Sequence, residues 1–440
     1  MTIHSIRRAA LAIVATGAMA GCSLGSLTDV PRPSNILDPD ALQTSDGAIA
    51  MYNGALSEFN RAFFGGQQQN GGSGVIPGNF AMAGGILADE YTLPSADDID
   101  QRTDAAGVSG QYTFPIMAVA YVNSGQAIQY LRQYAPNAPV AYTARLHLNR
   151  GYLALFMSEL FCSGVPLSEA AEAGKVIYGS PLSTAELQQY ALAQFDTALA
   201  PFGADTGKVA LAARLGQARA YLGMKQYDKA AAAAGKVPTN FSYDATYSTN
   251  VASAAGYFQP GGVFAWASSS DNEGVNGLPY ISSGDPRVKF TKVSNINQMD
   301  IYQPTAWRSS GNLTISVENG IDARLIEAEY LLSQGNATWL DKLNELRTRV
   351  TGLAPLTDPG TPAARVDLLF RERAFWLYGT GHRQGDLRRL VRQYQRPQSD
   401  VYPKGTYKGG FLYGTYTNIG VGLHEVEANA NYKGCIDREA

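Results

Sequence analysis

Apolar residues recur every three to four positions along much of the chain, a spacing that places them on one face of an α-helix. The first run begins at Ser45, where Ser45 or Asp46 is expected to cap the helix, and Gly65 is expected to end it. Pro115 is a favourable first-turn residue and is expected to begin a later helix. The pattern predicts further helices at residues 80–87, 115–134, 140–161, 184–199, 209–224, 227–236, 321–333, 338–350 and 363–377.

Two consecutive alanine-rich helices are joined by a short connection. Small and aromatic residues stand where the two helices of a tetratricopeptide-type hairpin pack together, at Ala218, Tyr221, Tyr227 and Ala230. Residues 241–317 break the helical period, because Gly, Ser, Asn and Pro recur every few positions. We therefore expect a mainly α-helical protein with a tetratricopeptide-like helical-hairpin scaffold and one long irregular insertion with short strands.

The N-terminus has the pattern of a bacterial lipoprotein export signal over residues 1–21. Arg7 and Arg8 precede an apolar stretch that is too short to span a bilayer as a mature helix. Small residues then stand before a cysteine, as lipoprotein signal peptidase requires, in Met19-Ala20-Gly21-Cys22. We expect lipidation of Cys22 and a polar tether over residues 22–39. An ordinary secretory signal cut near Ala20 is the alternative.

Composition narrows the class of partner. Charged residues make up 17% of the chain, against roughly 25% in an average protein. The formal net charge is −3, so no excess of basic residues attracts a polyphosphate, and nucleic acid is not an expected partner.

Two cysteines remain besides Cys22, namely Cys162 and Cys435. Two cysteines in an exported chain usually pair, because the periplasm oxidises thiols. We expect a disulfide between them that ties the end of the chain to its middle. The alternative is two buried free thiols.

Several motifs follow one another in a fixed order. The helix around Arg145 to Tyr152 runs into Gly164-Val165-Pro166-Leu167, and Asp285-Pro286-Arg287 precedes the last helices. Near the C-terminus, Leu369-Phe370-Arg371-Glu372-Arg373 leads to His382-Arg383-Gln384-Gly385-Asp386-Leu387-Arg388-Arg389. Together these segments resemble the SusD/RagB family of outer-membrane nutrient-binding lipoproteins. Gln384 and Gly385 depart from the family, which usually has large apolar residues there.

The resemblance implies a non-catalytic lipoprotein, anchored to the outer membrane and facing the cell surface. Such a protein captures a glycan or an oligopeptide and delivers it to a SusC-like TonB-dependent transporter, its membrane partner. The resemblance leaves glycan, glycopeptide and peptide open as ligands. It also implies a single SusD-like domain, with boundaries at 40–440 for the whole, 45–237 and 321–390 for the scaffold, 241–317 for the insertion and 397–440 for an irregular tail.

The sequence contains no clear catalytic motif. The charged residues near the C-terminus form a dense run of Glu372, Arg373, His382, Arg383, Asp386 and Arg388. Arg383 and Asp386 lie three apart on one helical face and are expected to form buried ion pairs that join the last helices to the scaffold. The histidines lack zinc-site spacing, and no cofactor or metal is expected. An acidic segment, Asp97, Asp98, Asp100 and Asp104, is read as a solvated loop rather than a Ca²⁺ site.

A membrane-anchored glycoside hydrolase on a helical scaffold remains the alternative function. It would need two carboxylates about 5–9.5 Å apart. Glu159, Glu273 and Glu318 are the residues that could supply them.

A sugar site would stack sugar rings on aromatic side chains that lie in irregular chain rather than on helical stripes. Trp339 and Trp376 lie on predicted helices and are assigned to the core. The candidates for ligand binding are Tyr91, Trp266, Tyr280, Tyr302, Trp307 and Arg308.

Overall fold

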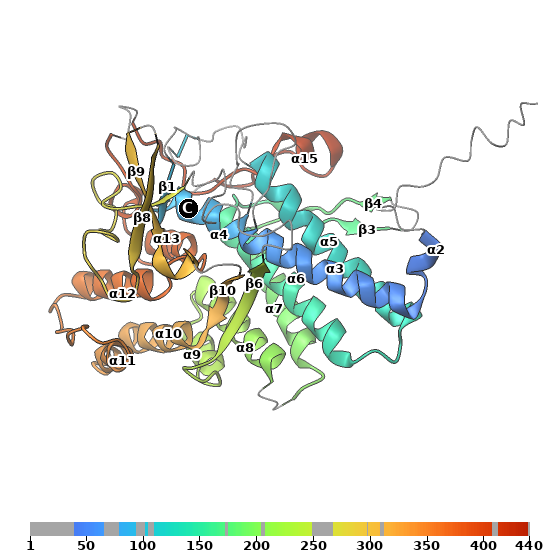
Figure 1. Ribbon diagram of the computed structural model, residues 1–440, viewed down its shortest axis with the longest axis horizontal. Coiled ribbons are helices and arrows are strands. Elements are labelled where there is room, and N and C mark those ends of the chain that lie inside the picture. Colours follow the sequence, from blue (N-terminus) through green and yellow to red (C-terminus); the bar gives the residue numbers. More distant parts are fainter. Residues whose placement is uncertain are drawn as a thin grey trace, which may run out of the picture.

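The computed structural model describes most of the chain after the export signal. The described residues are 39–65, 79–93, 102–103, 110–171, 175–203, 207–248, 267–296, 298–308, 312–406 and 412–438. Cys22, Trp266 and the acidic segment from Asp97 to Asp104, apart from residues 102–103, lie outside them. Helices dominate the described part, as the sequence predicts, and the strands form small two-stranded sheets (Figure 1).

The N-terminal helices stack on one another in chain order. Their bounds are α2 (Pro39–Leu42), α3 (Ser45–Phe64), α4 (Phe80–Leu87), α5 (Gly110–Tyr134), α6 (Val140–Leu160), α7 (Thr184–Leu199), α8 (Lys208–Gly223) and α9 (Tyr227–Ala234). From α5 to α9 each helix packs against the next, and α3 lies along α5 (Figure 1). This succession of helical hairpins is the scaffold that the alanine-rich pattern predicts.

The C-terminal helices extend the same stack. Their bounds are α10 (Gly320–Ser333), α11 (Trp339–Arg347), α12 (Pro362–Trp376), α13 (Arg383–Arg392), α14 (Gln398–Val401) and α15 (Leu423–Ala428). α10 packs against α9 on one side and α11 on the other. The side chain of Asn319 caps α10 by accepting hydrogen bonds from the backbone N–H groups of Ile321 (3.0 Å) and Asp322 (3.1 Å). The chain therefore resumes the scaffold where the insertion ends.

The insertion is closed at its base by two of its own strands. The antiparallel pairs are β1 (Tyr91–Thr92) with β7 (Ser268–Ser269), β2 (Val165–Pro166) with β5 (Pro181–Leu182), β3 (Glu169–Ala170) with β4 (Val176–Ile177), β6 (Ser242–Ser248) with β10 (Asn312–Asn319), and β8 (Phe290–Ile296) with β9 (Met299–Pro304). β6 follows α9 and β10 leads into α10, so their pairing lets the insertion leave and rejoin the scaffold at neighbouring points (Figure 1).

The cap of α3 and the start of α5 differ from the prediction. Thr44, rather than Ser45 or Asp46, caps α3, and its hydroxyl accepts a hydrogen bond of 3.0 Å from the Gly47 N–H. α5 begins at Gly110, so Pro115 lies inside the helix and not in its first turn. Proline removes one intrahelical hydrogen bond there, and the helix tolerates this loss close to its N-terminal end.

The core centres on α6, which lies between α3 and α5 on one side and α7 and α8 on the other. Phe156 of α6 stacks on Phe80 with ring centroids 4.1 Å apart, and every residue from 148 to 158 is buried. Trp339 is buried among the apolar residues of the last helices, while Trp376 is partly buried at the edge of that cluster. Within the described residues, no helix is both long and apolar enough to cross a membrane.

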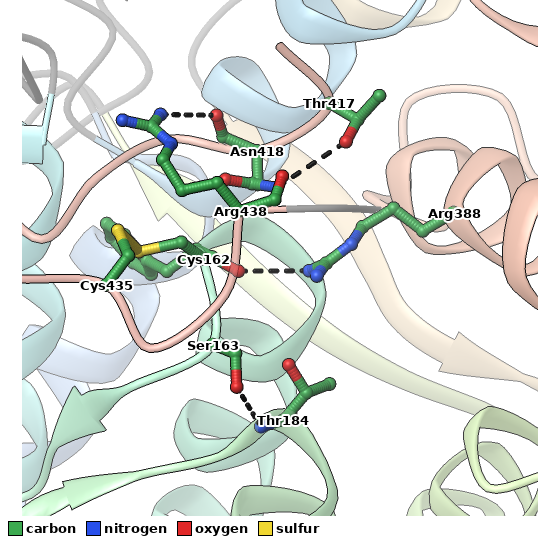
Figure 2. Close-up of a disulfide and its surroundings, with 9 residues drawn as sticks. Cys162, Ser163, Thr184, Arg388, Thr417, Asn418, Cys435 and Arg438 are labelled. Atoms are coloured by element: carbon green, nitrogen blue, oxygen red, sulfur yellow. Dashed lines mark hydrogen bonds between the residues drawn. A yellow bond between two sulfur atoms is a disulfide. The ribbon is translucent and has the colours of Figure 1, made fainter. Parts of the chain in front are cut away.

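The predicted disulfide between Cys162 and Cys435 is confirmed, with an S–S distance of 2.04 Å (Figure 2). It joins the segment just after α6 to the last described residues of the chain. Backbone hydrogen bonds reinforce this connection, because Ser163 donates to Asp437 (3.0 Å) and Ile436 donates to Ser163 (2.8 Å). The C-terminal tail is thereby fixed to the centre of the scaffold.

Candidate functional site

The structure brings several candidate aromatic residues together where the insertion meets the loop after α12. Trp307 lies in the short 3₁₀ helix η2 (Thr305–Arg308) that follows β9. Its ring centroid is 5.2 Å from that of Phe64, 6.3 Å from that of Tyr91 and 6.5 Å from that of Tyr378. Trp307 is partly exposed, so it covers this cluster while retaining some contact with solvent.

Tyr91 and Tyr280 belong to the same cluster, but both are 0% exposed. Their ring centroids lie 5.9 Å and 4.8 Å from that of Tyr378, respectively. Neither ring has an exposed face in this structure, so neither can stack directly on a sugar ring. The sequence showed that both residues lie in irregular chain, but irregular chain can pass through a core, and sequence alone does not reveal that burial.

The remaining candidates have different outcomes. Tyr302 on β9 is partly exposed, and its backbone N–H donates to the Ser268 hydroxyl over 2.9 Å. Trp266 and the side chain of Arg308 lie outside the part of the chain that the structure describes. Tyr302 and Trp307 are therefore the two candidates that the structure places at an accessible position.

Gly379 explains how Trp307 approaches the core so closely. Its φ of 74° is a left-handed conformation that favours glycine, and a Cβ there would lie 2.4 Å from the Trp307 ring. The Gly379 N–H also donates to the Glu90 carboxyl Oε1 over 3.0 Å. Glycine at this position therefore lets the indole pack directly against the backbone whose N–H binds the Glu90 carboxyl.

Glu90 is the unusual ionisable group of this region. It is 1% exposed, and burial raises the pKa of its carboxyl to about 8. The hydrogen bond from Gly379 opposes that rise, and the neighbouring Asp89 adds to it. Asp89 itself is ion-paired with Arg383, whose Nε lies 2.6 Å from the Asp89 Oδ1. The carboxyl of Glu90 is therefore largely protonated below pH 8.

A network of buried charges joins α6, α8 and β10 to the start of α13. Arg219 of α8 donates to Glu159 of α6 over 2.5 Å and to Glu318 of β10 over 2.8 Å. His382 lies 3.2 Å from the same Glu318 and 3.6 Å from Asp322. Burial and Arg219 lower the pKa of His382, but the carboxylates of Glu318 and Asp322 outweigh them and raise it to about 9.

The network continues through α10, α12 and α13. Arg373 lies 3.0 Å from Asp322 and 2.8 Å from Asp386, and Asp386 also accepts a hydrogen bond of 2.8 Å from Arg389. Arg389 is in turn ion-paired with Glu329 of α10. These pairs join elements far apart in the sequence, as the charge pattern predicts. Removing one partner of such a pair costs about 3–5 kcal/mol.

One part of this network has the composition of a metal site. The ligand atoms of Glu318, Asp322 and His382 lie within 4.8 Å of one another and all three residues are buried. Arg219 and Arg373 already neutralise the two carboxylates. His382 has a pKa of about 9, so its ring is an imidazolium cation at neutral pH and has no free nitrogen for a metal. The geometry is that of an ion-pair network rather than of a cation-binding site.

The carboxylates considered for hydrolysis are also engaged. Glu159 and Glu318 share the guanidinium of Arg219, while Glu273 accepts a hydrogen bond from the Tyr413 hydroxyl. Glu318 is 0% exposed and Glu273 is 4% exposed. Glu159 and Glu318 are thus bound to a common cation, which is the arrangement of a structural ion pair and not of an acid and a nucleophile on either side of a glycosidic bond.

A cavity of about 370 Å³ opens beside this network, at the ends of α6 and α8 and the starts of α7 and α13. Arg219, Arg388 and Arg389 contribute to its wall, together with Thr184. No motif in the sequence predicts this cavity. Its one signal in the sequence was Gly385, the small residue that departs from the family pattern and lines the cavity.

Comparison with solved structures identifies the fold. The chain matches a SusD superfamily protein from Bacteroides thetaiotaomicron with a TM-score of 0.67 and 14% identity, over 89% of this chain and 99% of the other. It matches a SusD-like carbohydrate-binding protein from Bacteroides vulgatus with a TM-score of 0.63 and 15% identity, over 88% and 97%. It matches surface glycan-binding protein A from Bacteroides uniformis with a TM-score of 0.61 and 14% identity, over 89% and 99%.

These likenesses extend over nearly the whole length of each compared structure. The protein therefore has the SusD-like fold, as the order of its motifs predicts. No family model and no curated protein sequence matches the chain.

Proposed function

We propose that this protein is a non-catalytic glycan-binding lipoprotein of the outer membrane that passes its ligand to a SusC-like TonB-dependent transporter. The observation that carries the proposal is the SusD-like fold over 88% or more of the chain, shared with structures named as carbohydrate-binding and surface glycan-binding proteins. Lipidation of Cys22 would supply the anchor, and the transporter would be the membrane partner.

The proposed contact surface is formed by Trp307 and Tyr302, with Arg308 and Trp266 as neighbours in the sequence of the insertion. Sugar rings present apolar faces that stack on aromatic side chains, and their hydroxyls need polar partners. Trp307 suits this role because its ring is supported from below by Phe64 and Tyr378 and stays partly exposed. A supported ring loses little conformational freedom when a ligand binds.

Binding should be measured on the mature protein with a panel of soluble oligosaccharides, first on the wild type and then on Trp307→Ala and Trp307→Tyr. Loss of the indole should weaken binding about tenfold, since 1.4 kcal/mol corresponds to a factor of ten. Trp307→Tyr retains an aromatic face and should retain most of the affinity. Trp339→Phe, in the buried cluster of the last helices, controls for loss of a tryptophan that only stabilises the fold.

Melting temperatures of the same variants separate a binding role from a packing role. Trp307 contacts the core, so Trp307→Ala should also lower the melting temperature, and affinity must be measured on the native fraction. Unchanged affinity in that fraction would remove Trp307 from the site. Release of shorter sugars from the bound oligosaccharide would contradict the non-catalytic proposal and favour the hydrolase alternative.

The partner proposal has a separate test. The lipidated protein should co-purify with a large outer-membrane β-barrel receptor from the same cells, and the gene for that receptor should stand beside its own. Co-purification of the soluble, unlipidated form with the same receptor would show that the two proteins recognise each other and do not merely share a membrane. Recovery of a glycan-binding protein without any such receptor would contradict the delivery step.

A further inference from the structure

The cavity beside the charge network runs from an exposed rim to a buried floor. Lys225, after α8, is exposed at the rim, whereas Arg219 and Arg388 at the floor are 5% and 3% exposed. Its volume of about 370 Å³ lies in the lower part of the range of small-molecule sites, roughly 300–1,000 Å³. That volume suits a ligand of the size of one sugar ring or a dipeptide.

Three of the arginines around the cavity are neutralised by carboxylates. Arg219 is paired with Glu159 and Glu318, Arg373 with Asp322 and Asp386, and Arg389 with Glu329 and Asp386. Each of these guanidinium groups therefore has at least two carboxylate partners. Their charges are satisfied by the protein itself.

Arg388 is different, because within the described residues it forms no ion pair. Its Nη1 donates to the backbone oxygens of Ser158 (2.8 Å) and Phe161 (3.0 Å) at the end of α6. Figure 2 shows the side chain reaching from α13 toward the disulfide segment. Its Nε and Nη2 are buried and have no hydrogen-bond partner among the described residues. The Nε–Nη2 edge of a buried guanidinium is thus left without an acceptor.

The electrostatics around Arg388 point the same way. Burial and the neighbouring Arg392 lower the pKa of Arg388 to about 10, against the opposite effect of Tyr402, Glu159 and Asp437, so it is still charged at neutral pH. A buried cation without a direct ion-pair partner is unfavourable, and a bound anion would relieve that cost.

Two further features adapt the cavity to a ligand. The Thr184 hydroxyl, in the first turn of α7, is buried without a hydrogen-bond partner in the described part of the chain, and Thr184 lines the same cavity. Figure 2 shows Thr184 beside Ser163, whose hydroxyl accepts a hydrogen bond of 3.3 Å from the Thr184 N–H. Gly385 keeps the space open, since a Cβ there would lie 3.0 Å from the Glu159 carboxyl carbon.

We propose that this cavity binds the carboxylate group of a small, polar ligand. The two carboxylate oxygens would accept parallel hydrogen bonds from Nε and Nη2 of Arg388, and one of them would also accept from the Thr184 hydroxyl. The flat, two-pronged edge of arginine matches a planar carboxylate better than a point charge does. This site is separate from the Trp307 surface and does not depend on the proposed glycan capture.

The test is calorimetric titration of the mature, disulfide-bonded protein with D-glucuronate and with D-glucose, which lacks the carboxylate. Glucuronate should bind at least about tenfold more tightly than glucose. Thr184→Val keeps the shape but removes the hydroxyl, and should weaken glucuronate binding several-fold, whereas Thr184→Ser should retain it. The backbone N–H of Thr184 donates to the Ser163 hydroxyl and is unaffected by either change.

Arg388→Lys tests the guanidinium edge directly and should weaken binding about tenfold or more, because a lysine cannot donate two parallel bonds. Arg349→Lys, at an exposed position after α11, is the matched control and should change nothing. Because Arg388 also holds the end of α6, its variant must show a native circular dichroism spectrum before its affinity is compared. Thr184→Val carries the test if Arg388→Lys does not fold.

Two further probes identify the source of the carboxylate. Glycylglycine binding without glucuronate binding would assign the site to a peptide C-terminus, and the reverse would assign it to a sugar acid; both support a carboxylate site. Three results would overturn the proposal. The first is equal affinity for glucose and glucuronate without glycylglycine binding, and the second is binding of sulfate alone. The third is unchanged affinity in both Thr184→Val and Arg388→Lys.

Discussion

At the scale of single residues, the protein buries two ionisable groups, Glu90 and His382, whose pKa values are raised by their surroundings. Glu90 is buried beneath the Trp307 cluster, and its carboxyl has a pKa of about 8. His382 is held between Glu318 and Asp322, and its imidazole has a pKa of about 9. Both groups keep their protons to higher pH in the folded state than in the unfolded chain, so both make stability fall as pH rises.

The two groups act over different pH windows. The unfolded chain releases the Glu90 proton near pH 4.5, and the folded protein releases it near pH 8. The contribution of Glu90 to the free energy of unfolding is therefore complete below pH 4.5 and declines between pH 4.5 and pH 8. For His382 the corresponding values are 6.5 and 9. Each pKa unit corresponds to about 1.4 kcal/mol, so each decline amounts to several kcal/mol.

Glu90→Gln should separate these effects. The amide is neutral at every pH, and its oxygen can still accept the hydrogen bond from Gly379, so the variant should lose the decline between pH 4.5 and 8. It should be more stable than the wild type above pH 8 and close to it below pH 4.5. The measurement is the free energy of unfolding by urea as a function of pH.

The decline between pH 6.5 and 9 should remain in Glu90→Gln, because His382 is unchanged. Glu345→Gln is a suitable control, since Glu345 lies at an exposed position on α11. A pH profile of Glu90→Gln parallel to that of the wild type throughout would show that Glu90 is ionised in the folded protein.

At the scale of elements, helical periodicity predicted most helices closely, because the scaffold buries one face of each helix. α4 and α7 have the predicted bounds, and the other long helices outside the start of α5 differ by a few residues at most. The predicted start of α5 at Pro115 was wrong, because the preference of proline for the first turn does not exclude a helix that begins several residues earlier. Thr44 replaced the expected cap because Ser, Thr and Asp at adjacent positions are equivalent by propensity alone.

The candidate site was less predictable than the helices. An aromatic residue in irregular chain can be buried, as Tyr91 and Tyr280 are, or partly exposed, as Tyr302 and Trp307 are. That difference is decided by segments packed from elsewhere in the chain, such as the loop that carries Tyr378. The acceptor-free edge of Arg388 is likewise a result of three-dimensional packing, and no local pattern distinguishes it from the paired arginines on either side.

The disulfide gives a prediction at this scale. It closes a loop of 273 residues between the end of α6 and the C-terminal tail. A double variant, Cys162→Ala with Cys435→Ser, should lose about 3–5 kcal/mol of stability, because the cross-link constrains the unfolded chain. Urea denaturation with and without dithiothreitol measures this: the reductant should destabilise the wild type and leave the double variant unchanged.

Hydrogen exchange shows where the effect appears. Residues 412–438 should exchange faster in the double variant, since the covalent link would be lost and non-covalent contacts such as the backbone hydrogen bonds of Ile436 and Asp437 to Ser163 would remain. α11, which packs against α10, serves as the internal reference. Equal stability of the wild type in oxidising and reducing conditions would contradict a structural role for the disulfide.

At the scale of the whole molecule, the fold persists where sequence identity is low. Structures of 14–15% identity share it over nearly their whole length. The features that identified it in the sequence were the order of the helices, the long insertion before α10 and the charged run that α13 uses for ion pairs. These features reflect requirements of the scaffold. The departures at Gln384 and Gly385 are accommodated locally, because Gln384 packs beside Gly84 of α4 and Gly385 lies against Glu159 of α6 at the cavity.

Membrane attachment is the property of the whole molecule that the proposed function most requires. The sequence Met19-Ala20-Gly21-Cys22 predicts lipidation, and each buried CH₂ of an acyl chain contributes about 0.8 kcal/mol to membrane retention. Cys22→Ala should therefore move the protein from the membrane fraction to the soluble fraction, with the signal cut near Ala20 as an ordinary secretory signal. Mass spectrometry of the N-terminal peptide, together with fractionation, measures both effects.

A matched control keeps this prediction specific. Cys22→Ala leaves Cys162 and Cys435 in place, so the released protein should keep its disulfide, its melting temperature and its affinity for a soluble ligand. It should fail only in uptake. The lipid anchor holds the protein beside a membrane-embedded transporter and so raises the effective concentration of the two partners, on which delivery depends. Membrane retention of Cys22→Ala with an unmodified N-terminus would show that another part of the protein holds it there, and full uptake by the released form would separate capture from anchoring.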